Sequence, residues 1–229
     1  MSNSKLVSFT RISPNRTSPR NHTIDTVTIH CVAGQLSVEQ IGGIFASDER
    51  RASSNYGIGT DGRVGMYVEE SDRSWCSSNA ANDNRAVTIE VASDTEEPYA
   101  VTDKAYSSLI ELLVDICRRN GIKRLVWSTD KNKRIHHLDG CNMTVHRDYA
   151  NKACPGEWLY SRHGEIAQAV NAKLSPPKTK AEEINDLVWE LAERGIVTDK
   201  ALWLKKAEGD VNVYWLMKKV VAFVGQHNL

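Results

Sequence analysis

Hydrophobic and polar positions alternate over residues 24–32, where the sequence reads IDTVTIHCV. A period of two with several β-branched residues is typical of a β-strand. Residues 55–60 and 64–68 flank Asp61-Gly62, a pair that favours a tight hairpin turn. Residues 86–91 and the short apolar segment 125–128 predict two further strands.

Three segments of the same region show a helical period instead. A capping box of Ser37 and Gln40 predicts a short helix to about Ala46. A longer helix is expected from Thr102 to about Asn120, with an apolar face of Leu109, Leu112, Leu113 and Ile116, and with Gly121 ending it. Residues 156–174 predict another helix, whose inward face carries Leu159, Ile166, Ala167 and Val170. Because strands and helices are interleaved, residues 1–174 are expected to form an α/β domain.

The pattern changes after residue 174. Residues 175–178 read Ser-Pro-Pro-Lys, and we interpret residues 175–180 as a linker. Residues 181–229 predict a small three-helix domain. Its first helix opens with a capping box of Thr179 and Glu182, ends at Gly195, and has an apolar stripe of Ile184, Leu187, Val188 and Leu191. The second is expected from Thr198 to about Glu208, and the third is lined by Val213, Leu216, Val220, Val221 and Val224.

Composition narrows the function classes. The 229 residues include 29 basic and 29 acidic side chains, and this balance argues against a nucleic-acid-binding protein. No apolar stretch approaches the roughly 20 residues of a membrane span. The polar residues 1–10 lack the apolar core of a secretory signal, so we expect synthesis in the cytoplasm, with any extracellular target reached by another route. Five cysteines, an odd number, exclude a complete disulfide framework and favour free thiols or metal ligands.

Three residues far apart in the chain are suited to a metal ion. His30 lies near the end of the first predicted strand, and His146 and Cys154 lie eight residues apart. Zinc favours imidazole nitrogen and thiolate sulfur, and a catalytic zinc site uses three protein ligands beside a water. From spacing alone, ordinary core or loop roles for the three residues stay open.

Residues 146–156, HRDYANKACPG, resemble the C-terminal metal motif of the type 2 N-acetylmuramoyl-L-alanine amidases. That family includes phage endolysins, bacterial autolysins and the peptidoglycan recognition proteins of animals. The resemblance covers about residues 22–172, with further matches at His30, the hairpin 55–62 and the segment 88–91, and is nearest to the endolysins of phages and prophages of Gram-positive bacteria. It implies a central mixed β-sheet flanked by helices, with zinc in a groove on one sheet face.

The resemblance also implies roles for individual residues. His30, His146 and Cys154 would bind Zn²⁺, and Glu90 and Lys152 would face the metal-bound water. A carboxylate there could move the proton of the water, and an ammonium group could stabilise an oxyanion. The alternatives are a surface strand residue for Glu90 and a solvated loop lysine for Lys152.

One position departs from the family pattern. Counting back from Asp61 places Ser54 where some relatives have a catalytic tyrosine, so Tyr56 is expected to pack or to line the substrate groove.

The leading hypothesis is an endolysin that hydrolyses the amide between N-acetylmuramic acid and L-alanine in peptidoglycan and acts on the cell wall after release. The alternatives are a non-hydrolytic peptidoglycan-binding protein and an autolysin or recycling amidase of the producing cell. The C-terminal helices are expected to attach to the cell wall, or else to form a homodimer or only stabilise the chain.

Several other residues have ordinary interpretations. His136 and His137 are interpreted as a loop pair, and Cys31 should point to the sheet face opposite His30. Cys117 is expected in the core, and Cys76 and Cys141 could pair with each other. Core positions are favoured for three tryptophans, Trp189, Trp203 and Trp215.

Overall fold

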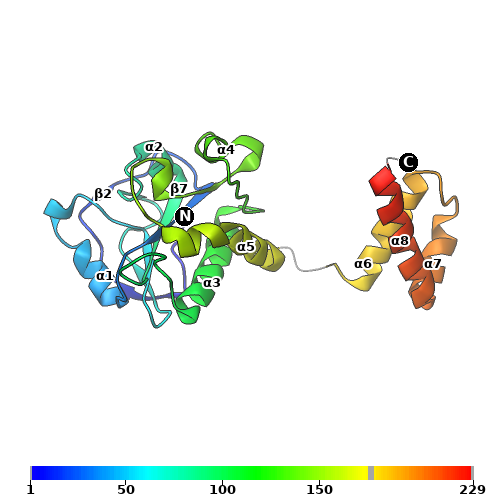
Figure 1. Cartoon of the computed structure of the whole chain (residues 1–229), viewed down its shortest axis with the longest axis horizontal. Coiled ribbons are helices and arrows are strands. Elements are labelled where there is room, and N and C mark those ends of the chain that lie inside the picture. Colours follow the sequence, from blue (N-terminus) through cyan, green and yellow to red (C-terminus); the bar gives the residue numbers. More distant parts are fainter. Residues whose placement is uncertain (1, 175–177, 228–229) are drawn as a thin grey trace. The chain divides into compact units, whose positions relative to one another are not determined.

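The computed structural model describes residues 2–174 and 178–227, which fall into two compact units on either side of residues 175–177 (Figure 1). Most of the Ser-Pro-Pro-Lys segment that we interpret as a linker therefore lies outside the described residues. In the part of the chain that is described, no helix is long and apolar enough to cross a membrane.

A six-stranded mixed sheet forms the centre of the larger unit, in the order β1-β5-β4-β7-β3-β8. The strands are β1 (Val7–Thr10), β3 (Thr26–Cys31), β4 (Tyr56–Ile58), β5 (Val64–Met66), β7 (Ala86–Val91) and β8 (Met143–Thr144). β4 and β5 form the predicted antiparallel hairpin, and the other neighbouring pairs are parallel. Two short strands, β2 (Arg16–Thr17) and β6 (Arg73–Ser74), pair separately.

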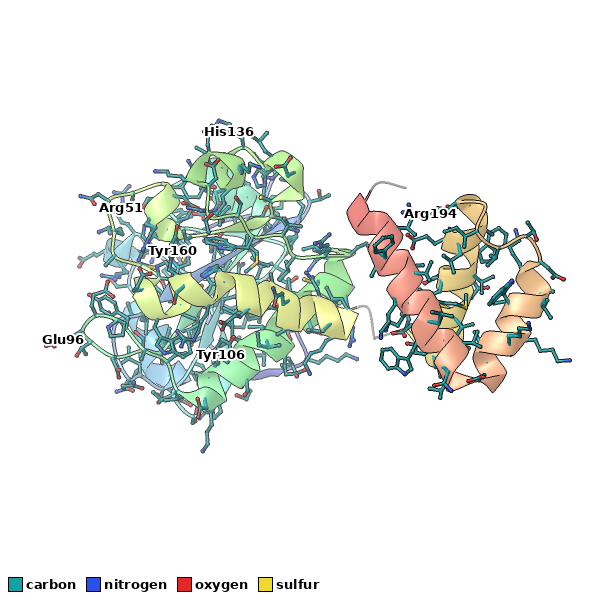
Figure 2. The ribbon with its side chains drawn as sticks, turned by 45° about the vertical axis from the view of Figure 1, so that its right-hand side comes forward. Arg51, Glu96, Tyr106, His136, Tyr160 and Arg194 are labelled. Atoms are coloured by element: carbon teal, nitrogen blue, oxygen red, sulfur yellow. The ribbon has the colours of Figure 1, made fainter. Side chains whose placement is uncertain are left out.

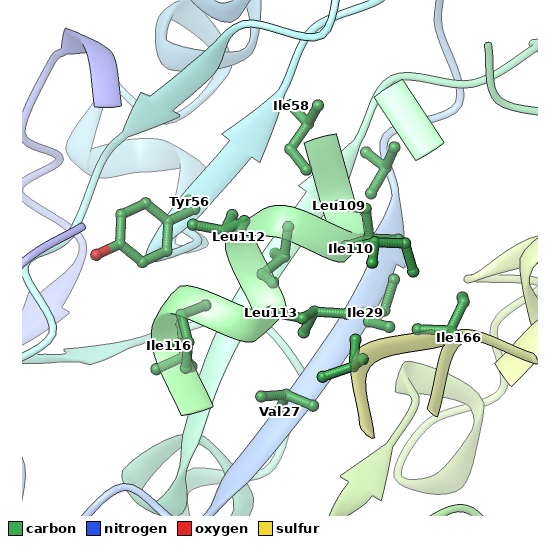
Figure 3. Close-up of a cluster of buried hydrophobic side chains, with 14 of the residues drawn as sticks. Val27, Ile29, Tyr56, Ile58, Leu109, Ile110, Leu112, Leu113, Ile116 and Ile166 are labelled. Carbon is green, nitrogen blue, oxygen red and sulfur yellow. The ribbon is translucent and has the colours of Figure 1, made fainter. Parts of the chain in front are cut away.

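Helices flank this sheet, as the family resemblance implies. Those of the larger unit are α1 (Val38–Ile44), α2 (Ala80–Arg85), α3 (Asp103–Asn120), α4 (Lys131–Ile135) and α5 (Gly156–Leu174). The Thr102 side chain caps α3, and Gly121, with a φ of 69°, ends it. Figure 3 shows the apolar face of α3 directed at Val27 and Ile29 of β3 and at Tyr56 and Ile58 of β4. Each such large apolar side chain stabilises the fold by about 1.5–3 kcal/mol when fully buried.

β3 is buried on both faces, although polar and apolar residues alternate along it. Its polar side chains are satisfied by other buried polar groups instead. The hydroxyl of Thr28 lies 2.8 Å from that of Thr144, and Asn82 of α2 donates to the Thr28 hydroxyl at 3.0 Å. This network ties β3, β8 and α2 together on the face of the sheet that also carries His30.

Residues 125–128 do not form the predicted strand. Leu125 is buried, but its N–H donates to Asn171 Oδ1, and the N–H of Val126 donates to Asn142 Oδ1, each at 2.8 Å. Two side-chain amides thus accept the backbone hydrogen bonds that a neighbouring strand would otherwise accept. The strand that does pair with β3 at this edge is β8, which is too short to show a period of two.

The smaller unit is a three-helix unit of α6 (Lys180–Glu193), α7 (Lys200–Gly209) and α8 (Val211–His227). The predicted capping box of Thr179 and Glu182 is present at the start of α6. Ile184, Val188 and Leu191 are buried in its core, as their spacing predicts.

The predicted core face of α8 is partly wrong. Leu216 is 59% exposed, whereas Tyr214 and Met217 are buried. Successive helical residues are rotated by about 100°, so Leu216 lies about 200° from Tyr214 and faces outward. Trp189 and Trp215 are also about half exposed rather than in the core, at 48% and 53%. Trp203 is partly buried against the core cluster.

Candidate metal centre

Three ligand atoms from distant segments converge at the end of β3. His30 comes from β3, His146 begins the 3₁₀ helix η3 (His146–Asp148), and Cys154 lies in the loop before α5. The possible ligand atoms of these residues all lie within 4.8 Å of one another. His30 Nδ1 is 3.3 Å from Cys154 Sγ, and the two imidazole rings are 5.1 Å apart between centroids.

The donor set and its spacing fit a zinc ion. Two ligands at about 2.0 and 2.3 Å from a tetrahedral zinc lie about 3.5 Å apart, close to the 3.3 Å between His30 Nδ1 and Cys154 Sγ. His146 Nε2 lies 3.1 Å from Ser78 Oγ, which leaves its Nδ1 free for a metal. A ligating histidine usually donates its other ring N–H in this way.

Burial and neighbouring groups set the charge of the three residues. Burial first, and then the neighbouring His146, lower the pKa of His30. Burial and the charge of Lys152 lower the pKa of His146. Both imidazoles are therefore neutral near pH 7, which is the form that binds metals. The hydrogen bond with Cys31, and then burial, raise the pKa of the Cys154 thiol, so that metal binding there would release a proton.

A buried ion pair fixes the segment that carries His146. Arg134 of α4 donates to both carboxylate oxygens of Asp148, at 2.9 and 2.5 Å, and both side chains are almost fully buried. The Asp148 carboxylate also accepts the N–H of Val145 at 3.2 Å, and the Arg134 guanidinium lies 4.5 Å from the centre of the Trp127 ring. η3 is thus anchored at both ends of its single turn.

Glu90 lies beside this cluster, on β7 directly opposite His30 in the strand register. Its Oε1 accepts a hydrogen bond from the Cys76 thiol at 3.8 Å, and among the described residues its buried Oε2 has no partner. Burial, and secondarily Cys31, raise the pKa of Glu90 to about 8. His30, Cys76 and Glu90 form a second group whose ligand atoms all lie within 4.8 Å of one another.

Lys152 is exposed and lines a pocket of about 640 Å³ that also reaches His146, Ser78 and Cys76. No ion pair of Lys152 with an acidic residue exists within the described part of the chain. Lys152, which the family resemblance singles out, is thus accessible in the same pocket as His146.

Tyr56 and Ser54 are both fully buried. The Tyr56 hydroxyl donates to Glu70 at 2.7 Å and accepts the N–H of Ser4, so Tyr56 is a packing residue and not a groove residue. Ser54 Oγ donates to the carbonyls of Tyr56 and Thr88. His136 lies at the outer surface of the larger unit, away from the pocket (Figure 2).

The cysteines differ from one expectation. Cys76 and Cys141 are both free, and Cys76 lies beside Glu90 instead. Cys31 belongs to the core cluster on the face opposite His30, as alternation predicts, and a hydrogen bond with the Cys154 thiol lowers the pKa of Cys31. Cys117 is buried in the core of α3, as expected.

The sequence interpretation missed several residues around the centre. Ser78, Arg134 and the acid Asp148 carry no signal of their own, because each acts through a partner from another segment. Asp148 lies within the motif that carries the family resemblance, and this position was the one clue to its role.

Comparisons with known proteins show the family of the chain and its fold. The family model of N-acetylmuramoyl-L-alanine amidases matches residues 20–157, more than half of the chain.

Among solved structures, AmpD is 18% identical with a TM-score of 0.53, and the match covers 73% of this chain and 99% of AmpD. The catalytic domain of XlyA is 13% identical with a TM-score of 0.52, covering 71% and 97%. The endolysin LysCS from Clostridium intestinale URNW is 19% identical with a TM-score of 0.50, covering 72% and 93%. These likenesses establish a common fold. No curated protein matches the chain.

Proposed function

The chain belongs to the N-acetylmuramoyl-L-alanine amidase family, and from this membership we propose that it is a zinc-dependent endolysin of a phage or prophage. Its enzymatic activity is hydrolysis of the amide that joins N-acetylmuramic acid to L-alanine in peptidoglycan. The proposal concerns the metal, the residues that act with it and the biological role.

One observation carries the proposal of a zinc site. Two imidazoles and a thiol from β3, η3 and the loop before α5 present their ligand atoms within 4.8 Å of one another. We assign His30, His146 and Cys154 as the zinc ligands. A zinc ion held there would polarise the scissile carbonyl and make its bound water more acidic.

Glu90 is the proposed general base and acid. Its free Oε2 is buried beside His30, so it can accept a proton from the attacking water and return it to the leaving amine. A pKa raised to about 8 by burial suits both steps, since the group holds and releases a proton near neutral pH. The Cys76 thiol orients the carboxyl group through Oε1.

Lys152 is proposed to stabilise the negative charge that develops on the carbonyl oxygen. Its side chain lines the same pocket as His146, and a cation at that place favours an oxyanion. The loop that carries Lys152 also carries Cys154, so metal binding and oxyanion stabilisation depend on one short segment.

We further propose residues 1–174 as the catalytic domain and residues 181–229 as a domain for attachment to the cell wall. The smaller unit has its own buried core and leaves Trp215, Leu216 and Phe223 of α8 more than half exposed. Exposed aromatic side chains of this kind are common at binding surfaces.

The test uses the full chain loaded with zinc and a suspension of purified bacterial cell walls. We expect loss of turbidity together with release of new L-alanine amino groups. Both should disappear on exhaustive chelation and in Cys154→Ser, and both should persist in Cys141→Ser, which removes a thiol outside the candidate centre. Activity that survives chelation would contradict the zinc mechanism.

The same preparation separates the alternatives. A non-hydrolytic binding protein would bind walls, release no amino groups and hold no stoichiometric zinc. A recycling amidase would hydrolyse soluble muropeptides faster than the polymer, whereas an endolysin should prefer the polymer.

A further inference from the structure

The carboxylate of Asp83, on α2, is buried, and within the described part of the chain it forms no ion pair. It accepts instead two backbone N–H groups, that of Cys76 at 3.0 Å and that of Ser77 at 3.2 Å. Other buried carboxylates of the larger unit, such as Glu70 and Asp148, pair with arginines. Because a buried carboxylate without a cation costs free energy, this arrangement indicates a role of Asp83 beyond packing.

Asp83 fixes residues 76–78, which we call the 76–78 segment and which lie between β6 and α2. The first two N–H groups of this segment both donate to the Asp83 carboxylate. A second residue of α2 holds the same segment, because Asn82 Nδ2 donates to Ser77 Oγ at 3.1 Å and to the hydroxyl of Thr28 at 3.0 Å. The 76–78 segment is therefore tied to α2 and, through α2, to β3.

Two side chains of the 76–78 segment contact groups that the proposed function uses. The Cys76 thiol donates to Glu90 Oε1 at 3.8 Å. Ser78 Oγ lies 3.1 Å from His146 Nε2. One short segment thus contacts both the proposed general base and a proposed metal ligand, and its backbone is held by one buried carboxylate.

The backbone of Ser78 supports a positioning role for this segment. Its φ of 63° is left-handed, a conformation that is unfavourable for a residue with a Cβ atom. Glycine adopts this conformation more easily, but glycine has no hydroxyl group to contact the His146 ring. Unfavourable backbone conformations of this kind persist where the surrounding structure holds them, and they cluster at functional sites. Here Asp83 and Asn82 supply the contacts that hold the segment.

A carboxylate suits the position of residue 83 better than an amide. Both oxygens of Asp83 accept hydrogen bonds, Oδ2 from the N–H of Cys76 and Oδ1 from the N–H of Ser77. Asparagine has nearly the same shape, but its NH₂ group only donates and would face one of these N–H groups. The substitution Asp83→Asn therefore releases part of the 76–78 segment without leaving a cavity.

We propose that Asp83 is a positioning residue for the amidase reaction. It holds the segment between β6 and α2 so that the Cys76 thiol fixes the carboxyl group of Glu90. The same backbone contacts let the Ser78 hydroxyl fix the ring of His146. Asp83 acts on both groups through two backbone N–H groups. This inference rests on the roles proposed above for Glu90 and His146.

The first experiment compares Asp83→Asn with the parent full chain at saturating zinc. Its kcat on a soluble muropeptide should fall roughly 10²-fold at an unchanged KM, because displaced catalytic groups slow the reaction without weakening substrate binding. Its zinc affinity, measured by competition with a chromogenic chelator, should fall roughly ten- to hundredfold. Glu70→Gln is the matched control, since it alters a buried carboxylate outside the candidate centre. It should lower the melting temperature and leave kcat and the zinc affinity unchanged.

Two further variants separate the two contacts of the 76–78 segment. Cys76→Ala should lower kcat and leave the zinc affinity unchanged. Ser78→Gly should weaken zinc binding roughly tenfold. The melting temperature of the zinc-free Ser78→Gly chain should not fall, because glycine tolerates the left-handed conformation. A segment with only a structural role would lose no zinc affinity in this variant.

A double-mutant cycle tests whether Asp83 acts through Cys76. Asp83→Asn/Cys76→Ala should have a kcat close to that of the slower single variant, because both changes disturb the same contact with Glu90. Losses in kcat that multiply would overturn the proposal. So would an Asp83→Asn variant that loses only stability. If Asp83→Asn does not fold, an unchanged zinc affinity in Ser78→Gly overturns it instead.

The zinc measurements distinguish a failure of this inference from a failure of the proposed function. If the parent chain releases no amino groups while the zinc affinities of the variants follow the predicted order, the proposed catalytic roles fail. The positioning of His146 by Asp83 is then still supported, because metal binding reports on it without catalysis.

Discussion

Glu90 combines two properties that rarely occur together in a strand residue. It lies on β7, a central strand of the mixed sheet that pairs in parallel with a strand on each side, and one of its carboxylate oxygens is buried without a partner in the described chain. Such an arrangement costs folding free energy, and perturbed carboxyl groups of this kind cluster at functional sites. The cost is understandable if the carboxyl group handles a proton during catalysis.

The substitution Glu90→Gln tests this role at the scale of one residue. Because glutamine keeps the shape but accepts no proton, kcat should fall roughly 10²- to 10⁴-fold while the zinc content stays at one per chain. Metal analysis and initial rates on cell walls measure the two quantities. A variant that loses its zinc would show that Glu90 is a ligand, as in the second group with His30 and Cys76.

At the scale of single elements, the turn η3 depends on the buried pair of Arg134 and Asp148. Arg134→Met should lower the free energy of unfolding by about 3–5 kcal/mol, because it leaves a carboxylate buried without its partner. The double variant Arg134→Met/Asp148→Leu should recover much of that loss in thermal or urea unfolding.

Zinc affinity should follow a different pattern in the same variants. Asp148 also accepts the N–H of Val145, next to His146, so the double variant should still bind zinc at least tenfold more weakly than the parent chain. Competition with a chromogenic chelator measures this affinity. An unchanged zinc affinity in the double variant would refute a positioning role for the ion pair.

The long helix α5 contains a histidine that links its stability to pH. Burial lowers the pKa of His163 to about 4, from 6.5 in an unfolded chain, and its Nδ1 lies 2.7 Å from the Leu159 carbonyl. The unfolded state therefore binds more protons between these values, so the contribution of His163 to the free energy of unfolding is complete above pH 6.5 and is lost as the pH falls to 4.

Between pH 6.5 and pH 4, this contribution to the free energy of unfolding amounts to about 3 kcal/mol. In His163→Leu the loss of stability between pH 6.5 and 4 should be smaller by that amount, as measured by urea unfolding at several pH values. His136→Leu, at an exposed position, is the matched control. A pH dependence identical to that of the parent chain would show that His163 is not the responsible group.

Elements whose hydrophobic pattern repeats several times could be predicted from the sequence. Elements that depend on tertiary contacts could not. α3 carries its own cap at Thr102 and its own stop at Gly121, so its limits can be read locally. β8 has two residues and exists because β3 lies beside it. The segment 125–128 has strand-like composition, but its N–H groups bond with the side chains of Asn142 and Asn171, which are distant in sequence.

The candidate site likewise has some residues that the sequence identifies and others that it does not. The motif around Cys154 identifies the candidate ligands because the family resemblance places them. Local sequence cannot show that Cys76 lies beside Glu90, or that Arg50 and Arg51 line the same pocket as His146, since loops bring these residues together. In α8, apolar residues occur at more positions than one buried face can hold. The prediction that Leu216 lies on that face is therefore wrong.

For the whole molecule, the two units have separate hydrophobic cores. A chain that ends at residue 174 should therefore keep its zinc content and its melting temperature within about 2 °C, because a change of 1 kcal/mol would shift a domain of this size by about 2–4 °C. Binding to intact cell walls should fall at least tenfold, as measured by co-sedimentation. Unchanged sedimentation would refute the attachment role of residues 181–229.

The central claim is that His30, His146 and Cys154 hold one zinc ion, and X-ray absorption at the zinc edge of the loaded full chain tests it most directly. The predicted spectrum contains one sulfur at about 2.3 Å and two imidazole nitrogens at about 2.0–2.1 Å. The sulfur contribution should vanish in Cys154→Ser and remain in Cys76→Ser. A sulfur signal that persists without Cys154, or a parent spectrum without sulfur, would contradict the account.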